Sequence, residues 1–231
     1  AQVGVLGLDF ASEGPISRAK GSSYLFNYRY STLGLLNDLK LNNTGQRIKY
    51  QDLSFKLNFP TEKTGTFSLW GIAGIDDTHK EAIKNPSDWK TDIDRVTNSW
   101  DTYVGTIGLR HQITAGEKSF VESHAAFSST DDRITTDYLS DDASVFTPDS
   151  RLKKQNGTLT LATSLTHKLS SSATFKAGIT HKQLFYNYDL SAAQDYIPST
   201  YAHIVNSAGS TNFTEAYSQI KYQLSPSILA N

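Results

Sequence analysis

The sequence predicts an all-β fold, specifically an antiparallel transmembrane β-barrel, and three observations support this prediction. About nine segments between Gly4 and Gln223 alternate apolar and polar residues with the period of two that is typical of strands. The connections between these segments are alternately short and long, as in membrane barrels, which have short periplasmic turns and longer external loops. The segments also run to about ten residues or more, the length that a tilted strand needs to cross a bilayer.

The alternation of connection lengths argues against the main alternative, an elongated soluble β-sheet protein with aromatic cross-strand pairs. A soluble sandwich has no reason to place every long loop on one edge, and its strands usually run to only about five or six residues. The expected short connections are Glu13–Gly21, Pro60–Gly65, Thr114–Lys118, Leu169–Ser172 and Leu224–Ser227. The expected long connections are Leu33–Ile48, Asp76–Asn98, Thr130–Leu152 and Asp189–Ser210.

Composition excludes several classes of function. The chain has 231 residues and a net charge of −1, which indicates neither a nucleic-acid partner nor a polybasic membrane patch. It has no cysteine, so disulfides, thiolate metal sites and a cysteine nucleophile are excluded. No run of about 18 apolar residues is present, which excludes a transmembrane helix. The chain contains no methionine, so we interpret it as a processed chain or an excerpt from a longer one.

The early segments each have an apolar face and a polar face. The segment 22–32 places four aromatic residues on one face, because successive side chains of a strand point to opposite sides. The next segment, Asp52–Phe59, repeats this pattern, and Pro60 then ends the strand because proline cannot donate to the ladder. The segment Thr66–Ile75 is less regular, since Trp70 and Ile72 lie opposite its other apolar residues.

The later segments follow the same pattern. They are Thr102–Ile113, Lys118–Ser129, Thr158–Lys168, Thr174–Thr180 and Glu215–Leu224. An open sheet with a lipid-facing side would leave backbone groups unpaired in hydrocarbon, at several kcal/mol each. We therefore expect the chain to contribute about nine to ten consecutive strands to a larger, closed barrel.

Three stretches near the amino end resemble TonB-dependent outer-membrane receptors of the Bacteroidetes type. They read GVLGLDFASEGPIS, GSSYLFNYRYSTLGLL and YQDLSFKLNFPTEKTGTFSLWGIAG, and the resemblance is most specific across residues 4–75. It implies a barrel of about 22 strands with a plugged lumen. Residues 1–231 would then be one partial outer-membrane β-barrel domain, without the plug, the first strand and the later strands.

The resemblance also implies a function and partners. Such a receptor takes up a scarce nutrient, such as a metal chelate, a glycan or a peptide, and the TonB energy-transducing complex pulls its plug. The expected location is the bacterial cell outer membrane, with many strands crossing it. The implied partners are outer-membrane lipid, the receptor's own plug domain and the TonB complex, with a surface lipoprotein as a further candidate; no cofactor or nucleic acid is implied. The alternative is a surface adhesin or structural barrel without active transport.

Two groups of residues are candidates for function. Charged residues on the polar faces should line the lumen or contact the plug: Arg29, Lys56, Arg110, Glu122, Lys176 and Lys221. Aromatic residues of the external loops could stack on a ligand, although packing within the loops is an alternative role. These aromatic residues are Trp89, Trp100, Tyr138, Tyr196 and Tyr201.

The expected loop Thr130–Leu152 is rich in aspartate, and calcium takes six to eight oxygen ligands. A weak candidate metal site therefore comprises Asp131, Asp132, Asp137, Asp141 and Asp142, although no EF-hand spacing is present and a solvated acidic loop is the alternative. In the loop Asp76–Asn98, Thr78 could cap a short helix through Ala82 that Asn85 and Pro86 would end.

Enzymatic chemistry is not expected. The sequence has no G-x-S-x-G elbow, H-E-x-x-H motif, P-loop or dinucleotide-binding fingerprint. An outer-membrane enzyme that modifies phospholipids would need a serine and a histidine on adjacent strands, for which Ser123 and His111 are the nearest candidates.

Overall fold

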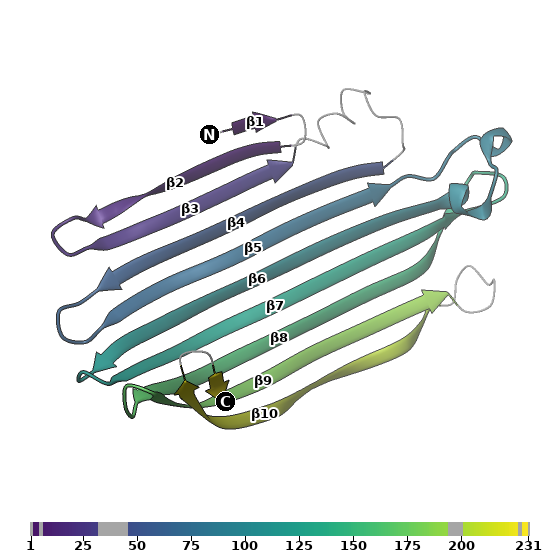
Figure 1. The fold of residues 1–231 in the computed structure, drawn as a ribbon. Coiled ribbons are helices and arrows are strands. Elements are labelled where there is room, and N and C mark those ends of the chain that lie inside the picture. The colour runs from purple at the N-terminus through teal and green to yellow at the C-terminus, as the bar shows by residue number, and fades with distance from the viewer. Residues whose placement is uncertain (1, 5–6, 32–45, 194–200, 226–227, 231) are drawn as a thin grey trace.

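The computed structural model describes residues 2–4, 7–31, 46–193, 201–225 and 228–230. Within these ranges, eleven antiparallel strands form one sheet, and each strand pairs only with its neighbours in sequence (Figure 1). The strands are β1 (Gln2–Gly4), β2 (Gly7–Ser17), β3 (Ser22–Ser31), β4 (Gln46–Pro60), β5 (Thr66–Lys80), β6 (Val96–Ala115), β7 (Ser119–Leu139), β8 (Phe146–Lys168), β9 (Ala173–Ala193), β10 (Tyr201–Ser225) and β11 (Ile228–Ala230). The prediction of an all-β antiparallel fold is therefore confirmed. No helix in the described part of the chain is both long and apolar enough to cross a membrane.

The strands are longer, and the connections shorter, than the sequence predicted. Strands β6 to β10 contain 20 to 25 residues each. The expected loop Thr130–Leu152 is mostly ladder, because only residues 140–145 separate β7 from β8. The expected turn Glu13–Gly21 shrinks to residues 18–21, and Pro15 pairs with Ser23 inside the β2–β3 ladder. Outside an apolar environment both faces of a strand can be polar, so the backbone ladder continues where the sequence loses its alternation.

The connection between β5 and β6 contains two short 3₁₀ helices, η1 (Pro86–Asp88) and η2 (Asp92–Arg95). The predicted helix from Thr78 is wrong, because Thr78 pairs with Trp100 in the β5–β6 ladder. Pro86 begins a helix instead of ending one, since its fixed φ suits the first helical position. The loops expected at Leu33–Ile48 and Asp189–Ser210 fall largely on residues 32–45 and 194–200, which lie outside the described ranges.

The register divides the residues of the sheet between two faces, because directly paired residues lie on the same side. We call the side that holds Phe55, Leu109 and Leu161 the apolar face. The opposite side, which holds Ser54 and Thr160, is the polar face. This division agrees with the alternation in the sequence.

The sheet is a single layer in the described part of the chain (Figure 1). The only described apolar residues that are buried are Ala82 and Leu139, and both lie at the end of the sheet opposite the tight turns. Large apolar side chains remain exposed instead, including Ile107 at 51% and Leu161 at 46%. A sheet of this kind has no core of its own, so the apolar face requires an apolar environment to cover it.

Candidate functional site

The structure places all six residues predicted to line the lumen on the polar face. They are Arg29, Lys56, Arg110, Glu122, Lys176 and Lys221. Their common side follows from the continuous register between β3 and β10. That this side lines a lumen or contacts a plug remains a prediction.

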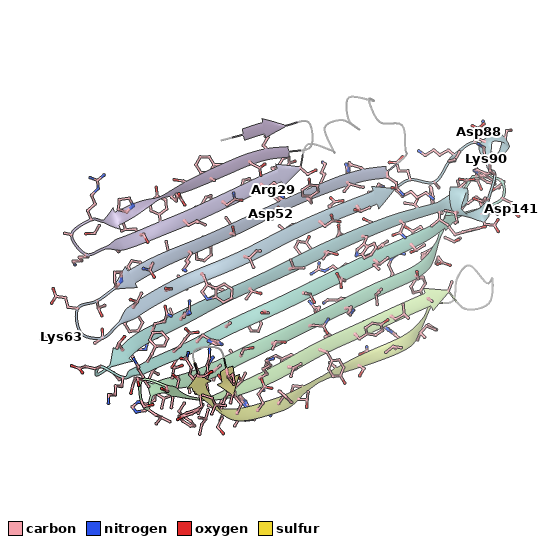
Figure 2. All side chains as sticks on the ribbon, viewed as in Figure 1. Arg29, Asp52, Lys63, Asp88, Lys90 and Asp141 are labelled. Atoms are coloured by element: carbon pink, nitrogen blue, oxygen red, sulfur yellow. The ribbon has the colours of Figure 1, made fainter. Side chains whose placement is uncertain are left out.

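On β3, Arg29 lies between the carboxylates of two neighbouring strands, of which Figure 2 labels Asp52. Its Nε donates to Asp9 Oδ1 at 2.9 Å and lies 4.0 Å from Asp52 Oδ2. Half of the Arg29 side chain is exposed, and exposed ion pairs stabilise a protein by about 0–1 kcal/mol only. These contacts therefore orient the guanidinium more than they stabilise the sheet.

Near the tight turns, the polar face combines an ion pair with a hollow. Arg110 Nη2 donates to Glu122 Oε2 at 2.5 Å, and Gln112 Nε2 donates to the same oxygen at 3.0 Å. Beside the pair is a hollow of about 360 Å³, lined by Lys56, Ser68, Trp70, Arg110 and His124. Basic side chains predominate around it, so the hollow suits an anionic group such as a carboxylate.

A second cluster forms around Arg95, at the end of the sheet opposite the tight turns. The Arg95 guanidinium lies 4.9 Å from the ring centre of Trp89 and 4.4 Å from that of Tyr138. Its Nε donates to the Leu139 carbonyl at 3.1 Å, and its Nη2 donates to the Asp141 carboxylate. The cluster therefore joins the β5–β6 connection to the turn between β7 and β8.

The aromatic residues predicted to bind a ligand do not form one site. Trp89 and Tyr138 both contact the Arg95 guanidinium. Trp100 lies further along β6 on the polar face, with half of its side chain exposed. Tyr201 begins β10, and its pairing partner places it on the opposite side of the sheet. Tyr196 lies outside the described residues.

The structure also separates the five aspartates proposed as a weak metal site. Asp131, Asp132 and Asp137 lie on β7, whose alternation sends neighbouring carboxylates to opposite faces. The partners are Arg133 and Gln155 for Asp131, Thr102 for Asp132, Arg151 for Asp137, Arg95 for Asp141, and Ser140 and Ser144 for Asp142. In the described ranges, no group of three or more histidine or acidic side chains is arranged to hold a metal ion.

The pKa of Asp142 gives a testable pH dependence. Hydrogen bonds from the hydroxyls of Ser140 and Ser144, and from the Ser144 N–H, lower the pKa of the Asp142 carboxyl to about 2. A carboxyl whose pKa is lowered by folding stabilises the folded turn above its ordinary pKa of about 4, and this contribution is lost as the pH falls through the lowered value.

We therefore expect hydrogen exchange of the Ser144 amide to lose protection between about pH 4 and pH 2, after correction for the intrinsic exchange rate. The measurement is hydrogen exchange followed by mass spectrometry of a peptide that covers residues 140–145. Asp142→Asn should abolish the pH dependence, because the amide does not titrate. Equal protection at pH 5 and pH 2 in the unsubstituted protein would contradict the role of the carboxylate.

The serine and histidine considered for enzymatic chemistry are cross-strand partners but have separate hydrogen bonds. Ser123 pairs with His111 in the β6–β7 ladder. The Ser123 hydroxyl lies 2.8 Å from the Thr163 hydroxyl, and His111 Nε2 lies 2.7 Å from the Thr64 carbonyl. The structure therefore does not arrange these two residues as a nucleophile and its base.

Comparison with known proteins identifies the fold. No family model and no curated protein matches the sequence. The chain is similar to the ferric-catecholate import receptor Fiu from E. coli K12. The open form has a TM-score of 0.51 and 11% identity over 89% of this chain, and the closed form has a TM-score of 0.50 and 12% identity over 88%. The ferric yersiniabactin uptake receptor FyuA from Yersinia pestis has a TM-score of 0.48 and 14% identity.

The chain spans 42% and 38% of the two Fiu chains. Both structures are of an import receptor. At such low identity the likeness concerns the fold alone. The chain has the fold of part of a receptor β-barrel.

Proposed function

We propose that this chain forms part of the barrel of a TonB-dependent outer-membrane receptor that imports a scarce nutrient. The main support is the height of the apolar band. On β6 the apolar face extends from Ile113 to Tyr103, about 34 Å at about 3.4 Å per residue. With the strand tilted by about 45°, this band is about 24 Å tall, close to the apolar height of about 25 Å that is typical of outer-membrane barrels.

Both limits of the band have the residues expected at a membrane interface. Phe59 pairs with Phe67 beside a tight turn, and the Phe67 ring stacks on His111 with 4.4 Å between ring centres. At the other limit, Tyr103 is 43% exposed, and the next residue of β6 on the same face is Asp101. Aromatic girdles at the two interfaces are a regular feature of such barrels. They support placing the apolar face against outer-membrane lipid.

The polar face would line the lumen and contact the plug domain. The hollow beside Arg110 and Glu122 offers basic side chains to acidic groups of the plug. The TonB complex would then pull the plug, and Lys176 and Lys221 would extend the contact surface toward the tight turns. Trp89, Trp100 and Tyr138, near the opposite end of the sheet, are candidate contacts for the incoming nutrient.

The resemblance of residues 4–75 favours the Bacteroidetes type of receptor, for which a surface lipoprotein is a candidate partner. Because Fiu imports ferric catecholates, a metal chelate is the first nutrient to test, ahead of a glycan or a peptide. The adhesin alternative is favoured by the length of β6 to β10, which exceeds what the apolar band requires. Uptake that depends on the TonB complex would exclude an adhesin without transport.

The barrel itself can be tested by gel electrophoresis of the intact protein that contains this chain. Purified in detergent, the protein should migrate differently before and after boiling, because a closed barrel stays folded until it is heated. The control is a boiled and refolded sample, which should regain the mobility of the unboiled protein. Identical migration of boiled and unboiled samples would contradict the proposal.

A further inference from the structure

The polarity of the two faces reverses beyond the apolar band. On β6, the side that is apolar between Ile113 and Tyr103 becomes charged at Asp101, which belongs to a cross-strand row of charged residues. This row consists of Asp77, Asp101, Arg133, Lys153 and Asp189, each paired with the next across β5 to β9. Charged side chains at this level cannot lie in hydrocarbon without a large cost. The ends of these strands therefore project beyond the membrane, with this side facing water.

The opposite side of the projecting strands contains one apolar row. One continuous row of paired residues crosses five neighbouring strands, and we call it the apolar ladder. The apolar ladder consists of Trp100, Ile134, Leu152, Leu190 and Val205 on β6 to β10. Trp100 is 50% exposed, Val205 is 37% exposed and the other three are half-buried. This row lies on the same side as the polar face but further from the tight turns.

The rows that flank the apolar ladder are polar or small. Toward the membrane the neighbouring row consists of Thr102, Asp132, Lys154, Tyr188 and Ser207. Away from the membrane, the row begins with Asn98, whose side-chain oxygen is buried without a hydrogen-bond partner in the described structure. The apolar ladder is thus a narrow strip that has hydrogen-bonding groups of both kinds along its edges.

The size of the apolar ladder determines what can cover it. Five strands span about 19 Å across the sheet, and one row of side chains is about 7 Å wide, so the strip offers about 130 Å². A stable protein interface buries about 800 Å² on each partner, so a protein that docked on this strip alone would lack most of the area that it needs. Lipid is excluded because the charged row lies on the back of the same strands. A small solute needs less contact area than a protein and, unlike lipid, can lie in water at this level.

We propose that the apolar ladder is the contact surface for an imported solute that has a flat aromatic or aliphatic face and polar edges. This inference rests on the proposed function and narrows its substrate class. Trp100 offers a ring for stacking, whereas Ile134, Leu152 and Leu190 offer no hydrogen-bonding groups. A glycan carries hydroxyls around every sugar ring, and those that met these three side chains would lose hydrogen bonds to water without replacement. The ladder therefore favours a chelate with an apolar ligand framework over a glycan.

Single thiols can test the ladder, because the chain contains no cysteine. Leu152→Cys places a thiol on the apolar ladder, and Lys153→Cys places one on the opposite side of the same strand. The intact protein is reconstituted in lipid nanodiscs, in a background without other reactive thiols, and the rate of maleimide labelling is measured. The probes are 2-naphthol, which has a flat apolar face, and maltotriose, whose sugar rings are surrounded by hydroxyls.

We expect 2-naphthol to slow labelling of Leu152→Cys at least fivefold and to leave Lys153→Cys unchanged, while maltotriose protects neither thiol. Protection by maltotriose alone would show that the substrate class is wrong. Protection of both thiols by 2-naphthol, or of neither, would overturn the ladder as a solute surface. A Leu152→Cys thiol that does not react without any probe would show that another part of the protein covers the ladder, which would also overturn the inference.

The boiling test of the same variants separates the inference from the proposed function. Variants that migrate as folded barrels but show no selective protection contradict the ladder alone. Variants and parent protein that show no change of mobility on boiling contradict the receptor barrel itself.

Discussion

Leu161→Arg should destabilise the membrane-inserted protein by about 2–4 kcal/mol, since an arginine on the lipid side near the bilayer midplane costs this much. Leu161 lies on the apolar face, with 46% of its side chain exposed to the surroundings of the sheet. The free energy of unfolding can be measured by urea titration of the protein folded into lipid vesicles. The urea concentration at the midpoint of unfolding should fall, while the slope of the unfolding free energy against urea concentration should stay unchanged.

The matched control is Thr160→Arg, one residue earlier on the same strand. Thr160 lies on the polar face, where it pairs with Lys182 and where arginine can remain hydrated. Phe55→Arg and Ser54→Arg form a second pair of the same design on β4. If both members of each pair cost the same free energy, the two faces have been assigned incorrectly.

Gly65→Ala should cost about 2–5 kcal/mol, which combines about 1–2 kcal/mol for a left-handed backbone with about 1–3 kcal/mol for overpacking. Gly65 lies in the turn between β4 and β5 with a φ of 82°, a conformation that disfavours any side chain. A Cβ at this position would lie 2.1 Å from the Gln112 carbonyl oxygen and 2.9 Å from Ile113 Cα. Because both contacts are with backbone atoms, no side chain can rotate away to relieve them.

Gly116→Ala provides the control for the backbone contribution. Gly116 lies in the turn between β6 and β7 with a φ of 67°, and a Cβ there would have no heavy atom within 4 Å. Its substitution should therefore cost only about 1–2 kcal/mol. The same urea titration measures both variants. Equal costs for Gly65→Ala and Gly116→Ala would show that the close approach of β6 to the turn is absent.

The strand interiors and their faces could be predicted from the sequence because most strands have one predominantly apolar side. Leu53, Phe55 and Leu57 alternate with polar neighbours, and the register places them on one side as expected. Strand ends could not be predicted in this way. Arg133 and Lys153 lie beyond the apolar band, where water reaches the sheet, so their strands show no simple alternation although the ladder continues.

The candidate site was predictable only in part. Arg29 and Arg110 share a face because each alternates with apolar residues along its own strand. This alternation is a local property of the strand. The cluster of Trp89, Arg95 and Tyr138 depends instead on the approach of two separate connections. No local pattern encodes that approach. The apolar ladder was missed for the same reason, since its five members come from five strands.

The meander order of the sheet has a consequence for how the chain folds. Every ladder joins segments that follow one another in the sequence, and β7, for example, pairs only with β6 and β8. Each added hairpin therefore closes only a short loop, which keeps the entropic cost of each step low. The chain can grow from one hairpin to the next, with the most recent strand acting as the template for its successor. Assembly of this kind is processive and needs no distant segment to arrive first.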